Sequence, residues 1–390
     1  MTSDILNVPL RKYPFAVALS VLLGASALLY TSDPKMLWMF TIALAMGISL
    51  FHASFGFSAA YRNLFLGRDT SGVQGHLILL AATTILFAPF LAQGSAFGSP
   101  VGGAVAPVGV GMATGAFLFG VGMQLAGACA SGTLFTAGSG NPRMLIVLVF
   151  FSAGTFWGSL DLAWWSSLPQ MGAVSLGNEW GWGIAVPAQL LVIGGLYLWL
   201  RKNNAQKSLI VDKTPALPLV HRLLRGPWPF LWAALSLAFL NWLTLISVGY
   251  PWSITWGFTL WAGKVMQAIG WDPASSSFWS SGFQMRALSR YVWEDTTSVM
   301  NLGIMAGASI ASIVSVKAVA KWDRRLRPLL SAIIGGLLLG YGARLAYGCN
   351  IGAFVSGVAS TSVHGWVWIL CALPGNWIGM KLRPVFRLSN

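Results

Sequence analysis

Charged residues are scarce in this chain. Of its 390 residues, only 9% are Asp, Glu, Lys or Arg, whereas 56% are hydrophobic. A soluble domain devotes about a quarter of its residues to charged side chains, because its whole surface faces water. The shortage therefore excludes a soluble globular domain and predicts that most of the surface faces a lipid bilayer. The formal net charge of +14 does not indicate nucleic-acid binding, because no basic stripe with stacking aromatics lies on a solvated face.

Cysteine is also scarce. Cys129, Cys349 and Cys371 are too few and too widely separated for a disulfide framework. None of them forms a C-x-x-C pair or lies near a histidine at the spacing of metal ligands, so we expect no structural metal and no cofactor. The apolar run near the N-terminus is not followed by a small-residue cleavage site. We interpret it as a retained membrane span.

Long apolar runs predict the fold class. A helix needs roughly 20 mostly apolar residues to cross the hydrocarbon layer. Runs of about this length predict an all-α integral membrane protein with ten spans, at 14–30, 36–52, 76–92, 108–126, 144–160, 183–200, 228–249, 297–316, 329–346 and 363–381. Basic residues are concentrated in alternate connections, and this asymmetry predicts that both termini lie in the cytoplasm.

Two segments interrupt this regular pattern. Basic residues, asparagines and prolines between 201 and 226 predict a cytoplasmic linker that separates two membrane halves, 1–200 and 227–390. Between 250 and 295, glycines, prolines and serines break the apolar stretches into pieces that are too short to span. Because the flanking spans require this segment to begin and end outside, we expect a re-entrant or interfacial excursion.

The chain contains an internal repeat. Residues 115–132 align without gaps on 335–352, with identical residues at Gly115, Leu118, Gly120, Gly122, Leu125, Ala126, Cys129 and Gly132. Small residues recur in any membrane helix, but eight matches in register that include a rare cysteine indicate true repetition. The predicted sides give the two copies opposite orientations. This is the arrangement of transporters built from two inverted repeats around an in-plane pseudo-two-fold axis. A weaker echo pairs Gly56 and Phe57 with Gly282 and Phe283.

Each repeat helix is followed by a break and a short apolar stretch. The breaks fall at Cys129 and Cys349, and the stretches 131–136 and 351–356 are too short to cross a membrane again. We expect two re-entrant half-helices whose unpaired backbone N–H groups attract an anion. The substrate path would then contain Cys129 and Cys349 with their neighbours Ser131, Asn350, Gly132, Gly352 and Gly56.

Thiols suit a sulfur-containing ligand, because they are soft donors and their thiolates exchange with sulfane sulfur. A lone cysteine in an apolar helix is more often a small buried hydrophobe, and this is our interpretation of Cys371. Arg344 lies well inside a predicted span. It either snorkels to the outer interface or draws an anion toward Cys349, with Gln124 as its neutral counterpart in the first half.

The strings LAGACASGTLF at Cys129 and GARLAYGCNIGAF at Cys349 resemble the YeeE/YedE family of membrane proteins, whose studied branch imports thiosulfate. The resemblance implies a funnel-like permease of the bacterial inner membrane, without enzymatic activity, in which Cys129 and Cys349 are the central cysteines of the path. It also implies a cytoplasmic sulfur carrier of the TusA type as a partner. The thiosulfate importers have a further cysteine in the element that aligns with residues 52–62 of this chain, at the position of Gly56. This chain has glycine there and no cysteine.

Three functions remain open at this point. The first is import of thiosulfate or a related small sulfur anion, with uptake of a selenium compound by the same path as its variant. The second is a membrane sulfur relay, in which Cys349 carries a persulfide to a cytoplasmic acceptor. The third is a sensor or anchoring subunit that signals through the linker 201–226.

Overall fold

The computed structural model describes residues 26, 29, 33–203, 218–280, 282–315 and 325–390. The first part of the chain contains α3 (Pro34–Ala53), α4 (Phe57–Phe65), α5 (Ser71–Gln93), α6 (Val110–Ala126), α7 (Ala130–Gly138), α8 (Pro142–Leu160), α9 (Leu162–Ser167), α10 (Leu176–Trp180) and α11 (Trp182–Lys202). The second part contains α12 (Leu219–Arg225), α13 (Phe230–Val248), α14 (Thr255–Ala268), α15 (Gly282–Ser289), α16 (Thr296–Val314), α17 (Leu326–Leu345), the π-helical η3 (Asn350–Val355), α18 (Ser356–Ala359) and α19 (Val363–Leu382). Single 3₁₀ turns are η1 (Pro273–Ser275), η2 (Val292–Glu294) and η4 (Arg383–Phe386).

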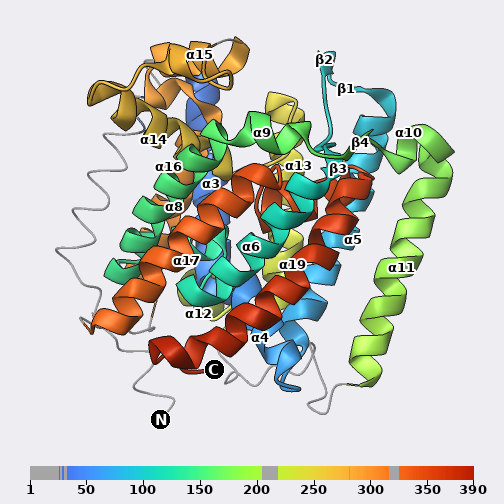
Figure 1. The fold of residues 1–390 in the computed structure, drawn as a ribbon. Helices are drawn as coiled ribbons and strands as arrows, with labels where there is room; N and C mark the ends of the chain where they lie inside the picture. The colour runs from blue at the N-terminus through green and yellow to red at the C-terminus, as the bar shows by residue number, and fades with distance from the viewer. Residues whose placement is uncertain (1–25, 27–28, 30–32, 204–217, 281, 316–324) are drawn as a thin grey trace.

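Strands contribute little to this helical fold (Figure 1). β1 (Ser95–Ala96) pairs with β2 (Ser99–Pro100), and β3 (Pro107–Gly109) pairs with β4 (Gln170–Ala173). Both pairs are antiparallel and lie at the end of the molecule that also carries α9, α10 and α15. The opposite end carries α4, α12 and the C-terminal residues.

Eight segments of the described chain are long and apolar enough to cross a membrane. They are Pro34–Phe65, Ser71–Gln93, Val110–Gly138, Pro142–Leu160, Trp182–Lys202, Phe230–Val248, Thr296–Val314 and Leu326–Ala359. These segments confirm eight of the ten predicted spans. Of the predicted span 14–30, only residues 26 and 29 are described, so this span stays a prediction. The predicted span 363–381 forms α19, which has the length of a span, but His364, Pro374 and Asn376 make it less apolar than the other eight.

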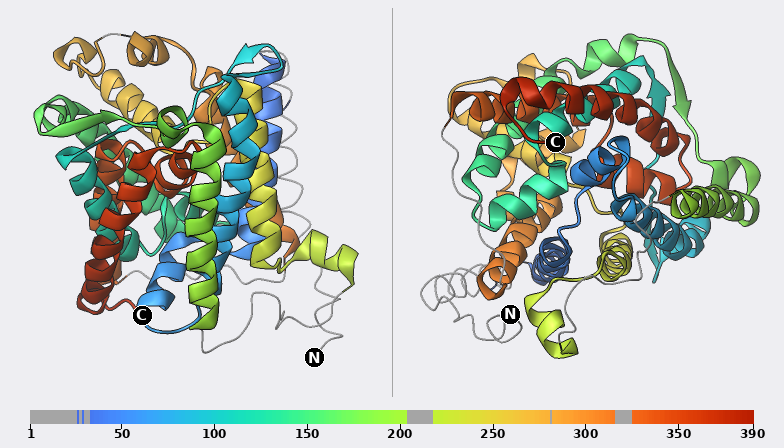
Figure 2. Two further views of the ribbon diagram at one scale, coloured as in Figure 1. Left: turned by 90° about the vertical axis from the view of Figure 1, so that its right-hand side faces the viewer. Right: turned by 90° about the horizontal axis from the view of Figure 1, so that it is seen from below.

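Glycines set the closest helix contacts. α6 packs against α17 and α19, α17 also packs against α8, and α3 packs against α16. A Cβ atom added to Gly122 would lie 2.5 Å from the backbone nitrogen of Leu339, and one added to Gly335 would lie 2.3 Å from that of Ala126. The backbones of α6 and α17 are therefore in contact at these points, as small residues allow in membrane helices. α11 lies at the edge of the bundle (Figure 2), and many of its apolar side chains, such as Leu191 and Leu198, are exposed.

The interrupted segment between α13 and α16 begins and ends at one end of the molecule. At the end of α13, the Gly249 carbonyl accepts a hydrogen bond from the Gly102 N–H, just after β2. The chain then enters the interior, where Trp252 and Ile254 are buried, and α14 leads back to α15 (Figure 1). With 14 residues, α14 is not among the eight candidate spans.

The predicted linker is described only in its last part. Residues 204–217 lie outside the described residues, and residues after them form α12. The Arg222 guanidinium of α12 lies 5.3 Å from the centre of the Trp232 ring, a cation–π contact that ties α12 to α13. The division of the chain into halves 1–200 and 227–390 stays a prediction.

Candidate functional site

Cys129 occupies the N-cap position of α7. α6 ends at Gly127 in a left-handed conformation, and Cys129 is extended, so that its side chain turns back over the first turn of α7. The Cys129 sulfur accepts a hydrogen bond from the Gly132 N–H at 3.3 Å and lies 3.4 Å from the Ser131 hydroxyl. Both cysteine and serine are buried. A thiol therefore replaces the usual oxygen of an N-cap side chain.

Cys349 likewise occupies the N-cap position of η3, but its side chain makes no capping hydrogen bond of good geometry. α17 ends just before Gly348, whose φ is +151°, and a Cβ there would lie 2.9 Å from the Ala353 nitrogen. Only glycine fits without strain at such a turn. The Cys349 sulfur lies beside the backbone N–H groups of Ile351 and Gly352. η3 is a π-helix, a form that is rare and is frequently found at functional sites.

Both predicted short helices are thus present, and both are longer than expected. The predicted stretch 131–136 lies within α7, and the predicted stretch 351–356 lies within η3 and α18, which together run from Asn350 to Ala359. The sequence identified the breaks correctly because glycine and cysteine interrupt otherwise continuous apolar runs.

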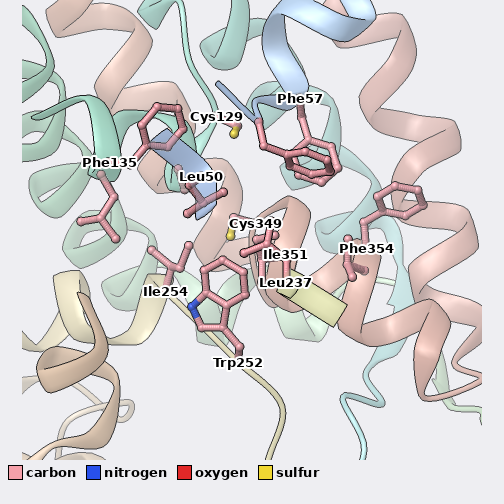
Figure 3. Packing of buried hydrophobic residues seen from close by; sticks show 14 of the residues in the cluster. Leu50, Phe57, Cys129, Phe135, Leu237, Trp252, Ile254, Cys349, Ile351 and Phe354 are labelled. Carbon is pink, nitrogen blue, oxygen red and sulfur yellow. The ribbon is translucent and has the colours of Figure 1, made fainter. Parts of the chain in front are cut away.

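The fold brings the two cysteines together in the interior. Figure 3 shows Cys129 and Cys349 within one buried cluster that also contains Leu50, Phe57 and Ile254. The two thiols are close enough to interact electrostatically, and Cys129 also interacts with the Tyr61 hydroxyl. Tyr61 in turn faces the side chain of Asn350. We call Cys129, Ser131, Cys349, Asn350, Tyr61 and Thr255 the cysteine centre.

Two members of the cysteine centre were not predicted from the sequence. Tyr61 belongs to α4, and Thr255 is the first residue of α14, where its side chain lies beside the Cys349 thiol. As a result, four helices, not two, begin at the centre, with N-cap residues Gly56, Cys129, Ile254 and Cys349. Helix N-termini carry partial positive charge, so their convergence favours an anion.

The weaker sequence repeat, which pairs Gly56 and Phe57 with Gly282 and Phe283, does not place both of its copies at the cysteine centre. Gly56 begins α4 at the centre, whereas Gly282 begins α15 at the end of the molecule, where Phe283 is exposed (Figure 1). Arg286, also on α15, is exposed as well. The start of α14, and not that of α15, lies beside Cys349.

The predicted glycines differ in the space around them. A Cβ on Gly132 would lie 3.2 Å from both the Ala128 side chain and the Cys129 sulfur, which is tight. A Cβ on Gly352 would make an ordinary contact of 3.6 Å with Ser253. Around Gly56, the nearest atom in the described chain is the Ser54 carbonyl oxygen at 4.0 Å, so a larger residue fits there.

Arg344 and Gln124 lie at opposite ends of the centre and make different contacts. The Arg344 guanidinium lies 4.7 Å from the centre of the Phe278 ring, beneath the excursion between α14 and α15. The Gln124 amide donates hydrogen bonds of 2.9 Å to the Ser58 carbonyl and to the Asn376 side chain. Gln124 therefore joins α4, α6 and α19.

Three arginines surround the C-terminal end of α6, on the side of Gln124. Arg383 donates a hydrogen bond of 2.6 Å to the Gln124 carbonyl, and Arg143 donates one of 3.0 Å to the Leu125 carbonyl. The third, Arg62, lies 3.4 Å from the Gln124 side-chain oxygen. Burial, together with the nearby guanidinium groups of Arg62 and Arg143, lowers the pKa of Arg383 to about 10. All three stay charged at neutral pH and make this end of the site electropositive.

Comparison with known families assigns the chain. Residues 52–378 match a family described as sulphur transport. The chain belongs to the sulphur transport family. The matched region of this sulphur transport protein begins before α4 and ends within α19, so it includes every residue of the cysteine centre. Family membership and eight candidate spans together make it a multi-pass membrane protein.

Individual relatives support the same assignment. The chain is 28% identical to the "Thiosulfate transporter TsuA" of Spirochaeta thermophila over 345 residues, covering 86% of this chain and 95% of that protein. It is 26% identical to the Escherichia coli protein of the same name over 289 residues, covering 69% and 73%. The "Probable transporter YedE" of E. coli is 32% identical over 142 residues. The chain spans about a third of the length of the YedE relatives that it matches.

Proposed function

We propose that this protein imports thiosulfate, or a related small sulfur-containing anion, across the bacterial inner membrane along a path through Cys129 and Cys349. The observation that carries the proposal is the convergence of two thiols and four helix N-termini at one buried centre. Relatives named thiosulfate transporters align over most of this chain. In this proposal the protein spans the lipid bilayer, and both of its termini lie in the cytoplasm. It transports its substrate without enzymatic activity.

The centre suits an anion that must lose its water. Backbone N–H groups and helix dipoles bind negative charge without a formal cation in the bilayer. The thiols add soft contacts for sulfur, and the Ser131 hydroxyl adds a donor. Conduction requires binding that is strong enough for entry and weak enough for release. A lining of neutral groups meets this requirement better than a fixed guanidinium would.

The two ends of the path carry the positive charge. Arg344 at the outer end draws the anion toward Cys349, and Arg62, Arg143 and Arg383 attract it at the inner end. Long-range attraction of this kind raises the local concentration of an anion at each mouth. The centre itself needs no charged side chain, because the helix termini supply the field.

The architecture is that of two inverted repeats, and glycine contacts support it. In the sequence alignment, Gly115 corresponds to Gly335, and Gly122 corresponds to Gly342. A Cβ on Gly115 would lie 2.8 Å from the Gly342 carbonyl oxygen, and one on Gly122 would lie 2.9 Å from that of Gly335. Each glycine thus meets the counterpart of the other, which is the exchange that a two-fold axis between α6 and α17 produces. Around this axis, α7 with η3 and α4 with α14 act as re-entrant half-helices.

The relay function is the second candidate. Backbone N–H groups at Ile351 and Gly352 lie beside the Cys349 sulfur and would donate to a persulfide anion there, although burial of the thiol opposes its charged form. The thiolate of Cys349 would attack the outer sulfur of thiosulfate, forming an S–S bond and releasing sulfite, and a TusA-like carrier would then accept the sulfur. A persulfide on Cys349 after exposure to thiosulfate, detected by mass spectrometry, would support the relay, because permeation alone leaves no adduct. For the transport function, uptake of a selenium-containing anion along the same path is the variant.

Uptake of radiolabelled thiosulfate into proteoliposomes tests the proposal. We expect uptake by the wild-type protein and its loss when Cys129 and Cys349 are both replaced by alanine. Cys371→Ala is the matched control, because Cys371 lies on α19 and is not part of the cysteine centre. Unchanged uptake by the double variant would rule out a role of the two thiols, and no uptake by the wild type would rule out the transport function.

A further inference from the structure

Two polar side chains beside Cys349 are buried and make no hydrogen bond of good geometry in the described part of the chain. Asn350 is only 1% exposed, and its side-chain oxygen and nitrogen have only a weak contact with the Tyr61 hydroxyl. Thr255 is 5% exposed, and its hydroxyl has only a weak contact with the Cys349 thiol. Buried polar groups are almost always hydrogen-bonded, because an unmet donor or acceptor forfeits its hydration without compensation. Such exceptions need an explanation.

Both side chains flank the same thiol. Asn350 follows Cys349 directly and faces Tyr61 of α4, and the Thr255 hydroxyl lies beside the Cys349 sulfur. Trp252, which precedes Thr255 in the extended segment, is close to Cys349 in Figure 3, and its indole N–H is likewise unpaired. Three of the residues with unpaired polar atoms thus lie around one thiol, where the proposed anion passes.

The other half of the centre is different. Ala130 follows Cys129 where Asn350 follows Cys349, so no amide is present there. The Cys129 sulfur already accepts the Gly132 N–H and lies next to Ser131. Within the cysteine centre, the unpaired side-chain donors therefore belong to the Cys349 side.

We propose that Asn350 and Thr255 bind oxygen atoms of the transported anion and make the site specific for a sulfur oxyanion. This inference rests on the proposed transport function. The amide N–H groups and the hydroxyl donate to the sulfonate-type oxygens, and the terminal sulfur points toward Cys129. A site built to hydrogen-bond a substrate rejects an analogue that lacks the partner atoms, because the buried groups then stay unpaired. An anion without oxygen atoms, such as hydrosulfide, gains no binding affinity from these two residues, because it has no oxygen to accept their hydrogen bonds.

A matched set of variants separates this role from a structural one. Thr255→Val removes the unpaired hydroxyl, and Thr255→Ser keeps it. Thr259→Val is the control, because Thr259 is buried one turn later on α14 and its hydroxyl already donates to the Thr255 carbonyl at 3.0 Å. Asn350→Ala gives the second half the residue type that the first half has at the corresponding position, Ala130. Binding of thiosulfate to the purified full-length protein and its melting temperature without thiosulfate are measured together.

We expect Asn350→Ala and Thr255→Val each to weaken thiosulfate binding about tenfold or more, as for loss of a hydrogen bond to a charged group. Their melting temperature without thiosulfate should be unchanged or higher, because an unmet polar group is removed. Thr255→Ser and Thr259→Val should bind normally, and inhibition of uptake by hydrosulfide should be the same in all variants.

Two results would overturn the inference. One is wild-type affinity in both Asn350→Ala and Thr255→Val, which leaves the transport function intact. The other is a fall in hydrosulfide inhibition parallel to the loss of thiosulfate binding, because this would indicate general damage to the site. If the wild-type protein neither binds nor transports thiosulfate, the transport proposal fails, and this inference fails with it.

Discussion

Gly342 lies directly on Gly115, so that a Cβ on Gly342 would be 2.5 Å from the Gly115 carbonyl oxygen. This contact joins α6 and α17, the two helices that end shortly before Cys129 and Cys349. The distance between the two helices therefore determines how the two thiols lie relative to each other. Gly342 lies seven residues before Cys349 and Gly115 fourteen before Cys129, so their contact supports the geometry on which the proposed function depends.

Gly342→Ala should separate α6 from α17. Overpacking of this kind costs about 1–3 kcal/mol, so we expect a lower melting temperature and slower thiosulfate uptake. Gly194→Ala on α11 is the control, because no described atom lies within 4 Å of a Cβ there. Wild-type stability and uptake in Gly342→Ala would show that the helix contact tolerates displacement.

Gly56→Cys should be accepted by the fold and should place a third thiol at the start of α4. Space around Gly56 allows the side chain, whereas Gly132→Ala would press on the Cys129 sulfur at 3.2 Å. We expect an unchanged melting temperature and retained uptake for Gly56→Cys, and reduced uptake for Gly132→Ala. A large loss of stability in Gly56→Cys would contradict the space that the structure assigns to this position.

Arg344→Gln should weaken the capture of thiosulfate from the outer side. Removal of the cation lowers the local concentration of the anion, so we expect the KM of uptake to rise about tenfold with little change in maximal rate. Arg286→Gln, on exposed α15, serves as the control. A fall in maximal rate at constant KM would argue that Arg344 supports the fold and does not attract the substrate.

Arg62→Gln should slow uptake mainly at low ionic strength. Arg62, Arg143 and Arg383 create a positive inner end, and salt screens the attraction that they exert on an anion. The deficit relative to wild type should shrink as salt is raised, whereas Arg387→Gln, exposed near the C-terminus, should show none. A deficit that is independent of salt would assign Arg62 a packing role.

The sequence predicts the spans and the two cysteine breaks well, because long apolar runs and their interruptions are local signals. α19 is less clear, since it carries His364 and Asn376. In the folded protein His364 contacts the Ala346 carbonyl at 3.1 Å, and Asn376 accepts a hydrogen bond from Gln124. Polar residues that find partners within the bundle weaken the hydropathy signal without preventing a long helix.

Tyr61 and Thr255 could not be predicted in the same way. Thr255 follows a proline-, serine- and tryptophan-containing stretch that is typical of a loop, and its position beside Cys349 depends on how α13 and α14 direct the chain into the interior. Asn241 of α13 accepts a hydrogen bond of 2.8 Å from the Trp252 N–H and fixes this path. That contact joins elements whose proximity depends on tertiary structure, so no pattern in the sequence marks it.

The central claim is that an anion binds between Cys129 and Cys349. A structure of the full-length protein determined with thiosulfate tests it most directly. The account predicts density for the anion between the two thiols, with its oxygen atoms toward Asn350 and Thr255. Density elsewhere, or a thiosulfate-saturated protein whose cysteine centre contains no anion, would contradict it.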